Sequence, residues 1–192
     1  MLAALGSISA QQAKGTEKTY ADTLWLLNYS AMHPNATIQY TASDMVLHIH
    51  SDASYLSKPR ARSRAGGHYL LGGIRPDMSK PPTTRPCLNG SIHSISCIMS
   101  NVMGLAAEAK IGAAYIKGQE AVPIRTLLLE LGQPKPATPT QVDNYTADGF
   151  ANDTIKKKRS KVIDMRFYWI RDRTSQGQFL IYWHPGITNL GD

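Results

Sequence analysis

The sequence predicts an α/β domain built on a mixed sheet of five strands flanked by helices. Three observations predict this fold class. Strand-like segments follow one another without helices between residues 37 and 99, Ala- and Leu-rich helical segments come next, and two further strand segments lie at 141–147 and 179–186. The predicted order is therefore three strands, a helix, a strand, a helix and a last strand.

The first three strands are expected to form an antiparallel meander, because no helix separates them. The segment 37–56 alternates with period two: one face carries Met45, Leu47 and Ile49, and the other Val46, His48, His50 and Asp52. The segment 62–73 has glycines inside it and at its end. The turn pair Asn89-Gly90 introduces the third segment, which ends at residue 99.

The helical segments are recognised by composition and by their ends. Residues 100–120 are rich in Ala and Ile, and residues 123–132 begin with Pro123 and end with Gly132, which predicts two helices in tandem. A short helix is expected over 146–155. The basic stretch 156–178 predicts a long helix before the last strand.

Residues 1–40 are expected to be a connector outside the main domain, which spans 41–192. Residues 16–32 have helical spacing and are followed by a proline and an asparagine. The apolar opening lacks a basic leader and is interrupted by Lys14, so neither a signal peptide nor a membrane-spanning helix is predicted.

The chain of 192 residues has a formal net charge of +7. A basic surface favours polyanions or anionic membranes, although a charge of this size is also common in proteins that bind neither. Cys87 and Cys97 are the only cysteines, and no CxxC or Cys/His spacing is present. The composition thus supports neither a disulfide scaffold nor a zinc finger.

Three carboxylates lie in apolar surroundings near the ends of predicted elements. Asp52 follows the first strand pattern, Glu108 lies in the first long helix, and Asp143 lies in the fourth strand segment. An unpaired buried carboxylate is costly, so a shared divalent cation is the explanation that covers all three. Magnesium fits, because it takes oxygen ligands from a few carboxylates and from substrate phosphates.

The ordered motifs resemble the ribonuclease H domain of copia-type retrotransposon polyproteins, which lies downstream of reverse transcriptase. The matching stretches are "SDASY" at 51–55, "AEAKIGA" at 107–113, "VDNYTA" at 142–147, "KRSKVIDMRFYWIRD" at 158–172 and "NLGD" at 189–192. They cover about 150 residues, from residue 41 to the end. The resemblance implies a ribonuclease H-like fold, with residues 1–40 as a remnant of the upstream reverse transcriptase region.

The resemblance also implies an activity and a site. Asp52, Glu108, Asp143 and Asp192 match the catalytic acids, which hold two Mg²⁺ ions (Mn²⁺ can substitute) during endonucleolytic hydrolysis of the RNA strand of RNA–DNA hybrids. The implied partners are the hybrid and the reverse transcriptase portion of the parent polyprotein, without a membrane. The implied setting is intracellular: cytoplasm, virus-like particle or nucleus.

A basic face on the long helix is the expected contact with the nucleic acid backbone. Its residues are Lys157, Lys158, Arg159, Lys161, Arg166 and Arg173. His48 and His50 share a face with Asp52, but alternating histidines on a strand are expected to be structural and not metal ligands.

The sequence departs from the copia-type pattern at three places. Lys110 stands where many members have a second glutamate, Val162 stands where many have a histidine, and relatives continue beyond Asp192 into a helix that is truncated here. A catalytically inactive relic, or a domesticated nucleic-acid-binding module with the same fold, is therefore the alternative function. An integrase- or resolvase-type nuclease is disfavoured by the order of the acids.

Overall fold

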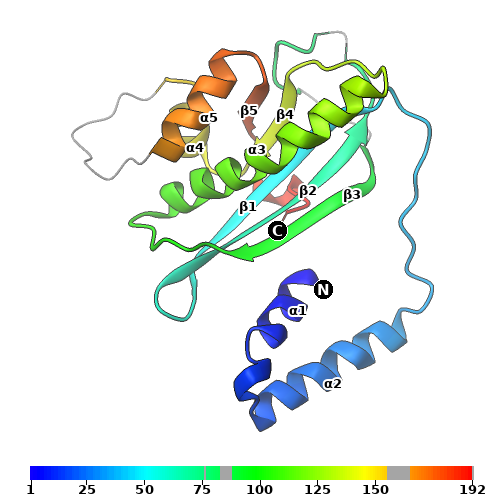
Figure 1. Cartoon of the computed structure of the whole chain (residues 1–192), viewed down its shortest axis with the longest axis vertical. Coiled ribbons are helices and arrows are strands. Elements are labelled where there is room, and N and C mark those ends of the chain that lie inside the picture. Colours follow the sequence, from blue (N-terminus) through cyan, green and yellow to red (C-terminus); the bar gives the residue numbers. More distant parts are fainter. Residues whose placement is uncertain (76, 83–87, 155–164, 192) are drawn as a thin grey trace.

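Five strands form one mixed sheet in the order β3-β2-β1-β4-β5 (Figure 1). They are β1 (Val46–Lys58), β2 (Arg62–Gly72), β3 (Leu88–Ile98), β4 (Thr138–Val142) and β5 (Phe179–Trp183). The first three are antiparallel neighbours, whereas β4 and β5 run parallel to β1. This computed structural model describes residues 1–75, 77–82, 88–154 and 165–191. The predicted α/β class and mixed sheet are confirmed.

Three helices lie beside this sheet, and the longest crosses its central strands (Figure 1). They are α3 (Ala106–Glu130), α4 (Tyr145–Ala151) and α5 (Met165–Ser175). Leu47, Ile49 and Tyr69 from β1 and β2 form the core with Ala114 and Ala121 of α3. The small alanine side chains allow the helix backbone to approach the sheet closely. Within the predicted helix 156–178, residues 165–175 are helical, and 155–164 lie outside the described residues.

The prediction of two tandem helices around Pro123 is wrong, because α3 is one helix of 25 residues with Pro123 inside it. Proline removes one helical hydrogen bond and leaves the carbonyl four residues earlier without its partner. That carbonyl belongs to Gln119, which is exposed, as is Pro123 itself, so water can solvate the group. Ala121 and Leu128 are buried on either side of the proline, and this packing keeps the helix continuous.

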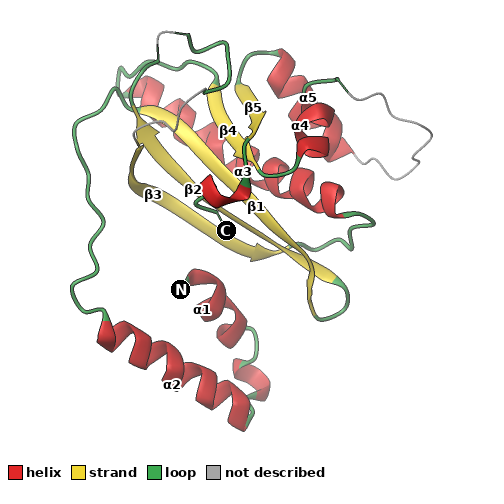
Figure 2. Ribbon diagram, turned by 180° about the vertical axis from the view of Figure 1, so that it is seen from behind, coloured by secondary structure: helices red, strands yellow, loops and turns green. Residues whose placement is uncertain are grey.

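The opposite face of β1 is covered by the C-terminal segment and not by a long helix. Figure 2 shows the short 3-10 helix η2 (Gly186–Thr188) in front of the sheet, with α3 behind it. The Asn189 side chain donates a hydrogen bond of 2.9 Å to the backbone carbonyl of Ser51, and the Leu190 N–H donates one of 3.1 Å to His50 Nδ1. As a result β1 is buried on both faces from Val46 to Ser51.

The N-terminal region forms a separate helical arm. It comprises α1 (Leu2–Ser9), the short 3-10 helix η1 (Gln12–Lys14) and α2 (Glu17–Met32), and the segment 33–45 leads from it into β1 (Figure 1). Lys58 and Arg64 donate hydrogen bonds of 3.1 and 3.3 Å to Ser7 Oγ, which fixes α1 beside the sheet. No helix among the described residues is long and apolar enough to cross a bilayer. The role of 1–40 as a connector stays a prediction.

Lys117 of α3 is buried at a cost to the stability of the fold. It is 0% exposed, and its Nζ has no hydrogen-bond partner among the residues that the structure describes. Burial lowers the pKa of this ammonium group to about 8, against the smaller opposing effects of Cys97 and Glu120. Between this value and the ordinary lysine pKa, the unfolded chain binds more protons than the folded one, so stability rises with pH across that window.

We therefore expect Lys117→Met to stabilise the protein at pH 7 by up to about 3 kcal/mol, the free-energy equivalent of the pKa shift. The gain should shrink as the pH rises above the folded-state pKa toward the ordinary lysine pKa, because the folded wild type then no longer carries the buried charge. Urea unfolding at pH 7 and above pH 9 measures both effects, with the exposed Lys18→Met as a control. If Lys117→Met raised the free energy of unfolding equally at both pH values, the stabilisation would not come from removing the buried ammonium charge.

Candidate functional site

Two carboxylates meet where β1 and β4 lie side by side. Asp52 is in β1, and Asp143 directly follows the last residue of β4. The parallel pairing aligns Ile49 with Thr140, and each aspartate is three residues beyond that pair. The strand register therefore brings two acids from distant parts of the chain to the same level of the sheet.

The ammonium group of Lys110 lies between these carboxylates. Lys110 Nζ donates a hydrogen bond of 2.6 Å to Asp143 Oδ2 and a second, short one to Asp52 Oδ1. The three side chains are only 15% (Lys110), 13% (Asp52) and 18% (Asp143) exposed, so solvent screens these ion pairs weakly. Burial alone would lower the pKa of Lys110, but the hydrogen bonds and charges of Asp143 and Asp52 raise it above its ordinary value.

The position of Lys110 on α3 explains why its side chain reaches this point. Lys110, Ala113, Ala114 and Lys117 are spaced at i, i+3, i+4 and i+7, which places them on one face of a helix. The last three are buried against the sheet. Lys110 therefore extends from the sheet-facing stripe of the helix.

Glu108 does not join the two aspartates. It is two residues before Lys110, which turns its side chain about 200° away around the helix axis. Its Oε2 accepts a hydrogen bond of 2.6 Å from the N–H of Gly104, just before the first turn of α3. An acid in the first helical turn also interacts favourably with the helix dipole.

The predicted cluster of three carboxylates is therefore not formed. Within the described ranges, which end at residue 191, no group of three or more His, Cys, Asp or Glu side chains is placed to hold a metal ion. The structure brings together Asp52 and Asp143 and leaves Glu108 apart. Asp192, the fourth acid implied by the resemblance, lies outside the described residues.

The segment preceding Asp192 packs next to Asp52. A Cβ atom added at Gly191 would lie 3.2 Å from the Asp52 Cβ, so only glycine fits this approach without displacement. Asn189 fixes the segment, since its Oδ1 accepts a hydrogen bond of 3.0 Å from the Gly191 N–H while its amide bonds to Ser51. Asn189 is thus a positioning residue at the site that the sequence analysis did not identify.

The histidines beside Asp52 are interior residues. His48 and His50 are each 1% exposed. Burial, followed by the charges of Arg75 and His50, lowers the pKa of His48 to about 4, so this imidazole is neutral at pH 7. His50 accepts the hydrogen bond from Leu190, as described above. The structural role expected for these two side chains stays a prediction.

The described basic residues of α5 differ in their contacts. Arg166 is half-buried. The guanidinium group of Arg173 lies 5.3 Å from the centre of the Trp169 ring, and Arg171 forms an ion pair with Asp153. Lys157, Lys158, Arg159 and Lys161 fall outside the described residues. The predicted nucleic-acid contacts of this group stay predictions.

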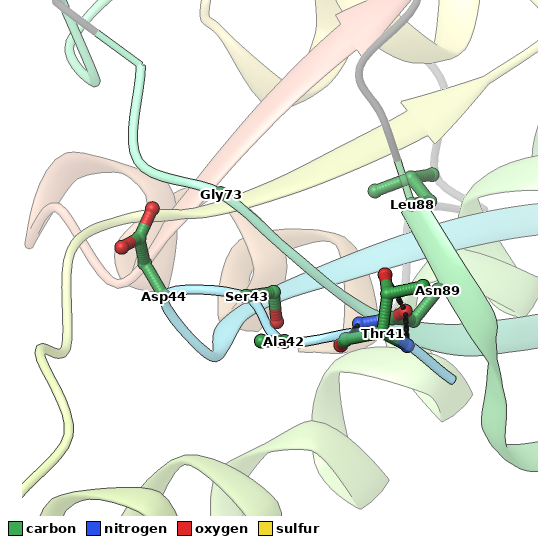
Figure 3. A pocket seen from close by; sticks show the side chains of 7 residues that line it. All are labelled: Thr41, Ala42, Ser43, Asp44, Gly73, Leu88 and Asn89. Atoms are coloured by element: carbon green, nitrogen blue, oxygen red, sulfur yellow. Dashed lines mark hydrogen bonds between the residues drawn. The ribbon is translucent and has the colours of Figure 1, made fainter.

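An open hollow of about 440 Å³ lies at the other end of β1 (Figure 3). Within it, Asn89 Oδ1 accepts hydrogen bonds of 2.7 and 2.8 Å from the N–H and hydroxyl of Thr41, and Asp44 accepts one of 2.7 Å from the Ile74 N–H. The polar groups of the hollow thus hold the segment that enters β1. Asp52 is about 20 Å further along the strand from Val46.

No protein-family model matches the chain, and no curated protein matches its sequence. The solved structure of LC11-RNase H1, isolated from compost by a metagenomic approach, gives a TM-score of 0.52 at 10% identity, covering 75% of this chain and 87% of that one. The structure of LC11-RNase H1 in complex with an RNA/DNA hybrid gives a TM-score of 0.50 at 10% identity, covering 75% and 88%. This chain has the RNase H-like fold. The RNase H domain of prototype foamy virus gives a TM-score of 0.43 at 18% identity, covering 74% and 79%.

The RNase H-like arrangement raises the question of whether these residues fit a divalent metal centre. The oxygens that Asp52 and Asp143 turn toward each other are the ones that bind Lys110 Nζ. The helix position that faces the pair carries a cation in place of a ligand. The residues therefore do not fit a metal ion shared between these two carboxylates while Lys110 is bound there.

We expect Lys110→Met to lower the free energy of unfolding on the order of 3 kcal/mol, because it leaves two largely buried carboxylates without their cation. Adding Asp143→Asn to this variant should restore part of the loss by removing one of the two like charges. Denaturant unfolding of the single and double variants measures the coupling free energy between Lys110 and Asp143. The exposed Lys18→Met variant is the control. Unchanged stability of Lys110→Met would show that the ion pairs contribute nothing to the fold.

Proposed function

We propose that this chain is the RNase H-type domain of a copia-type retroelement polyprotein and that it binds RNA–DNA hybrids without cleaving them. The RNase H-like fold and the ordered motifs from "SDASY" to "NLGD" support the assignment to this class. The hybrid complex of LC11-RNase H1 supports the substrate class. On this proposal the natural partners are the hybrid and the reverse transcriptase portion of the polyprotein, in an intracellular setting.

Recognition of the hybrid would use backbone charge and shape. The net charge of +7 favours a polyanion, and the 2′-hydroxyl groups in the minor groove distinguish a hybrid from duplex DNA without reading base edges. Arg166 and Arg173 are the described members of the predicted basic face. Arg171 is on the same helix but is not among the predicted contacts, and its guanidinium group forms an ion pair with Asp153.

The single observation that carries binding without cleavage is the position of Lys110 between Asp52 and Asp143. Metal-dependent hydrolysis of the RNA strand, with two Mg²⁺ ions held by the acids, is the competing function. It is supported by the fold and by the two aspartates, but it requires those carboxylates to be available to a metal. In this chain they hold an ammonium group.

We expect the protein to bind a labelled RNA–DNA hybrid more tightly than duplex DNA of the same sequence, measured by fluorescence anisotropy. Affinity should fall steeply between about 50 and about 200 mM salt as counterion release is suppressed. Arg166→Gln should weaken binding and reduce the slope of log affinity against log salt concentration by about one. The matched Arg171→Gln should change affinity and slope less. Equal affinity for hybrid and duplex DNA would contradict recognition of the hybrid.

We also expect no metal-dependent cleavage of that hybrid with Mg²⁺ or Mn²⁺, followed on a denaturing gel. An Asp52→Asn variant purified in the same way reports contaminating nucleases. Cleavage by the wild type that Asp52→Asn abolishes would establish the competing nuclease function.

A further inference from the structure

Asp52, Lys110 and Asp143 form a charge triad in which the ammonium group of Lys110 contacts both carboxylates. Two carboxylates and one ammonium group leave one net negative charge in a region where each side chain is at most 18% exposed. The ammonium contacts one oxygen of each acid, so the chain itself supplies a cation to the pair. The space between the two carboxylates is therefore already occupied by a cation of the chain itself.

The helix backbone holds Lys110 in this place. Ala109 and Ala113 are both fully buried at 0% exposure, so α3 cannot shift away from the sheet at this level without opening the core. The four-carbon side chain of Lys110 starts on the face of α3 that packs against the sheet. It is long enough to place its ammonium group beside the two strands. Freeing the carboxylates therefore requires the Lys110 side chain to move away from them or to be replaced.

A divalent cation would compete poorly for the same oxygens. Mg²⁺ needs carboxylate oxygens at about 2.0 to 2.1 Å and gains affinity from the number of charged ligands. With Lys110 present, a second cation between Asp52 and Asp143 meets like-charge repulsion at short range in a weakly screened region. Glu108 adds no ligand here, because it lies on another face of α3 than Lys110, where its Oε2 accepts a hydrogen bond from the Gly104 N–H.

We propose that Lys110 is a built-in replacement for a metal ion, which closes the Asp52–Asp143 pair to divalent cations, and that one substitution at this position opens it. The inference concerns the site of the proposed function and rests on its RNase H-type assignment. It explains why a chain with this fold binds its ligand without hydrolysing it. The position that faces the two aspartates, and not Glu108, decides whether a cation binds.

Titration of the full chain with Mn²⁺, in the absence of nucleic acid, tests the proposal. Water-proton relaxation reports Mn²⁺ bound to the protein, and subtraction of the Asp52→Asn variant removes binding elsewhere on the surface. The wild type should give no difference from Asp52→Asn. Lys110→Glu should bind Mn²⁺ about tenfold or more tightly than the wild type, because it removes the cation and adds a carboxylate ligand.

Two further variants separate the effect of removing the Lys110 cation from the effect of adding a carboxylate ligand. Lys110→Met removes the cation without adding a ligand, so its affinity should be intermediate. Lys110→Glu combined with Asp143→Asn should lose most of the gain. If Lys110→Glu does not fold, as judged by circular dichroism, the Lys110→Met and wild-type titrations decide the question.

Wild-type binding of Mn²⁺ that Asp52→Asn abolishes would overturn the proposal. The same holds if a folded Lys110→Glu variant, or Lys110→Met where Lys110→Glu is unfolded, binds no more Mn²⁺ than the wild type. Because no nucleic acid is present, failure of hybrid binding leaves this result unaffected, so the two proposals can fail separately.

Discussion

The parallel pairing of β1 with β4 forces two carboxylates together, and the surrounding structure has to neutralise them. Asp52 and Asp143 are each three residues beyond the aligned pair Ile49 and Thr140. Their neighbourhood is mostly closed to solvent, so water cannot disperse the charge. The chain meets this constraint with Lys110, which α3 delivers from its sheet-facing stripe. The packing of α3 against the sheet therefore also determines how the charge of the two carboxylates is neutralised.

The same strand is enclosed on its other face by the C-terminal segment. Asn189 and Leu190 bond to Ser51 and His50, and Gly191 approaches Asp52 so closely that a larger residue would have to displace it. His48 is buried in its neutral form on this face. Asp52 thus lies between a cation from the helix side and a backbone contact from the C-terminal side.

The sheet was predictable from the sequence because its signals are local. Period-two alternation and the turn pair Asn89-Gly90 indicate strands in the order that the structure has. The break predicted at Pro123 was wrong because burial of Ala121 and Leu128 outweighs one lost hydrogen bond, and such packing is not visible in a local window.

The sequence placed Asp52 and Asp143 at strand ends and so predicted that they meet. The strand end at Asp52 was wrong, because β1 continues to Lys58, and the role of Lys110 was not recognised. One signal was available in the sequence. Lys110 shares the i, i+3, i+4, i+7 stripe with Ala113, Ala114 and Lys117, while Glu108 is off that face. The search for a third acidic residue selected Glu108 as the α3 side chain that faces the two aspartates. Helix geometry would have selected position 110 instead.

The most direct test of the account is a crystal structure of the full chain grown in MnCl₂, with anomalous diffraction data collected to locate manganese. No anomalous peak should lie between Asp52 and Asp143, and the Lys110 side chain should bridge the two carboxylates. A manganese peak bound to both aspartates, with Lys110 displaced from them, would contradict it.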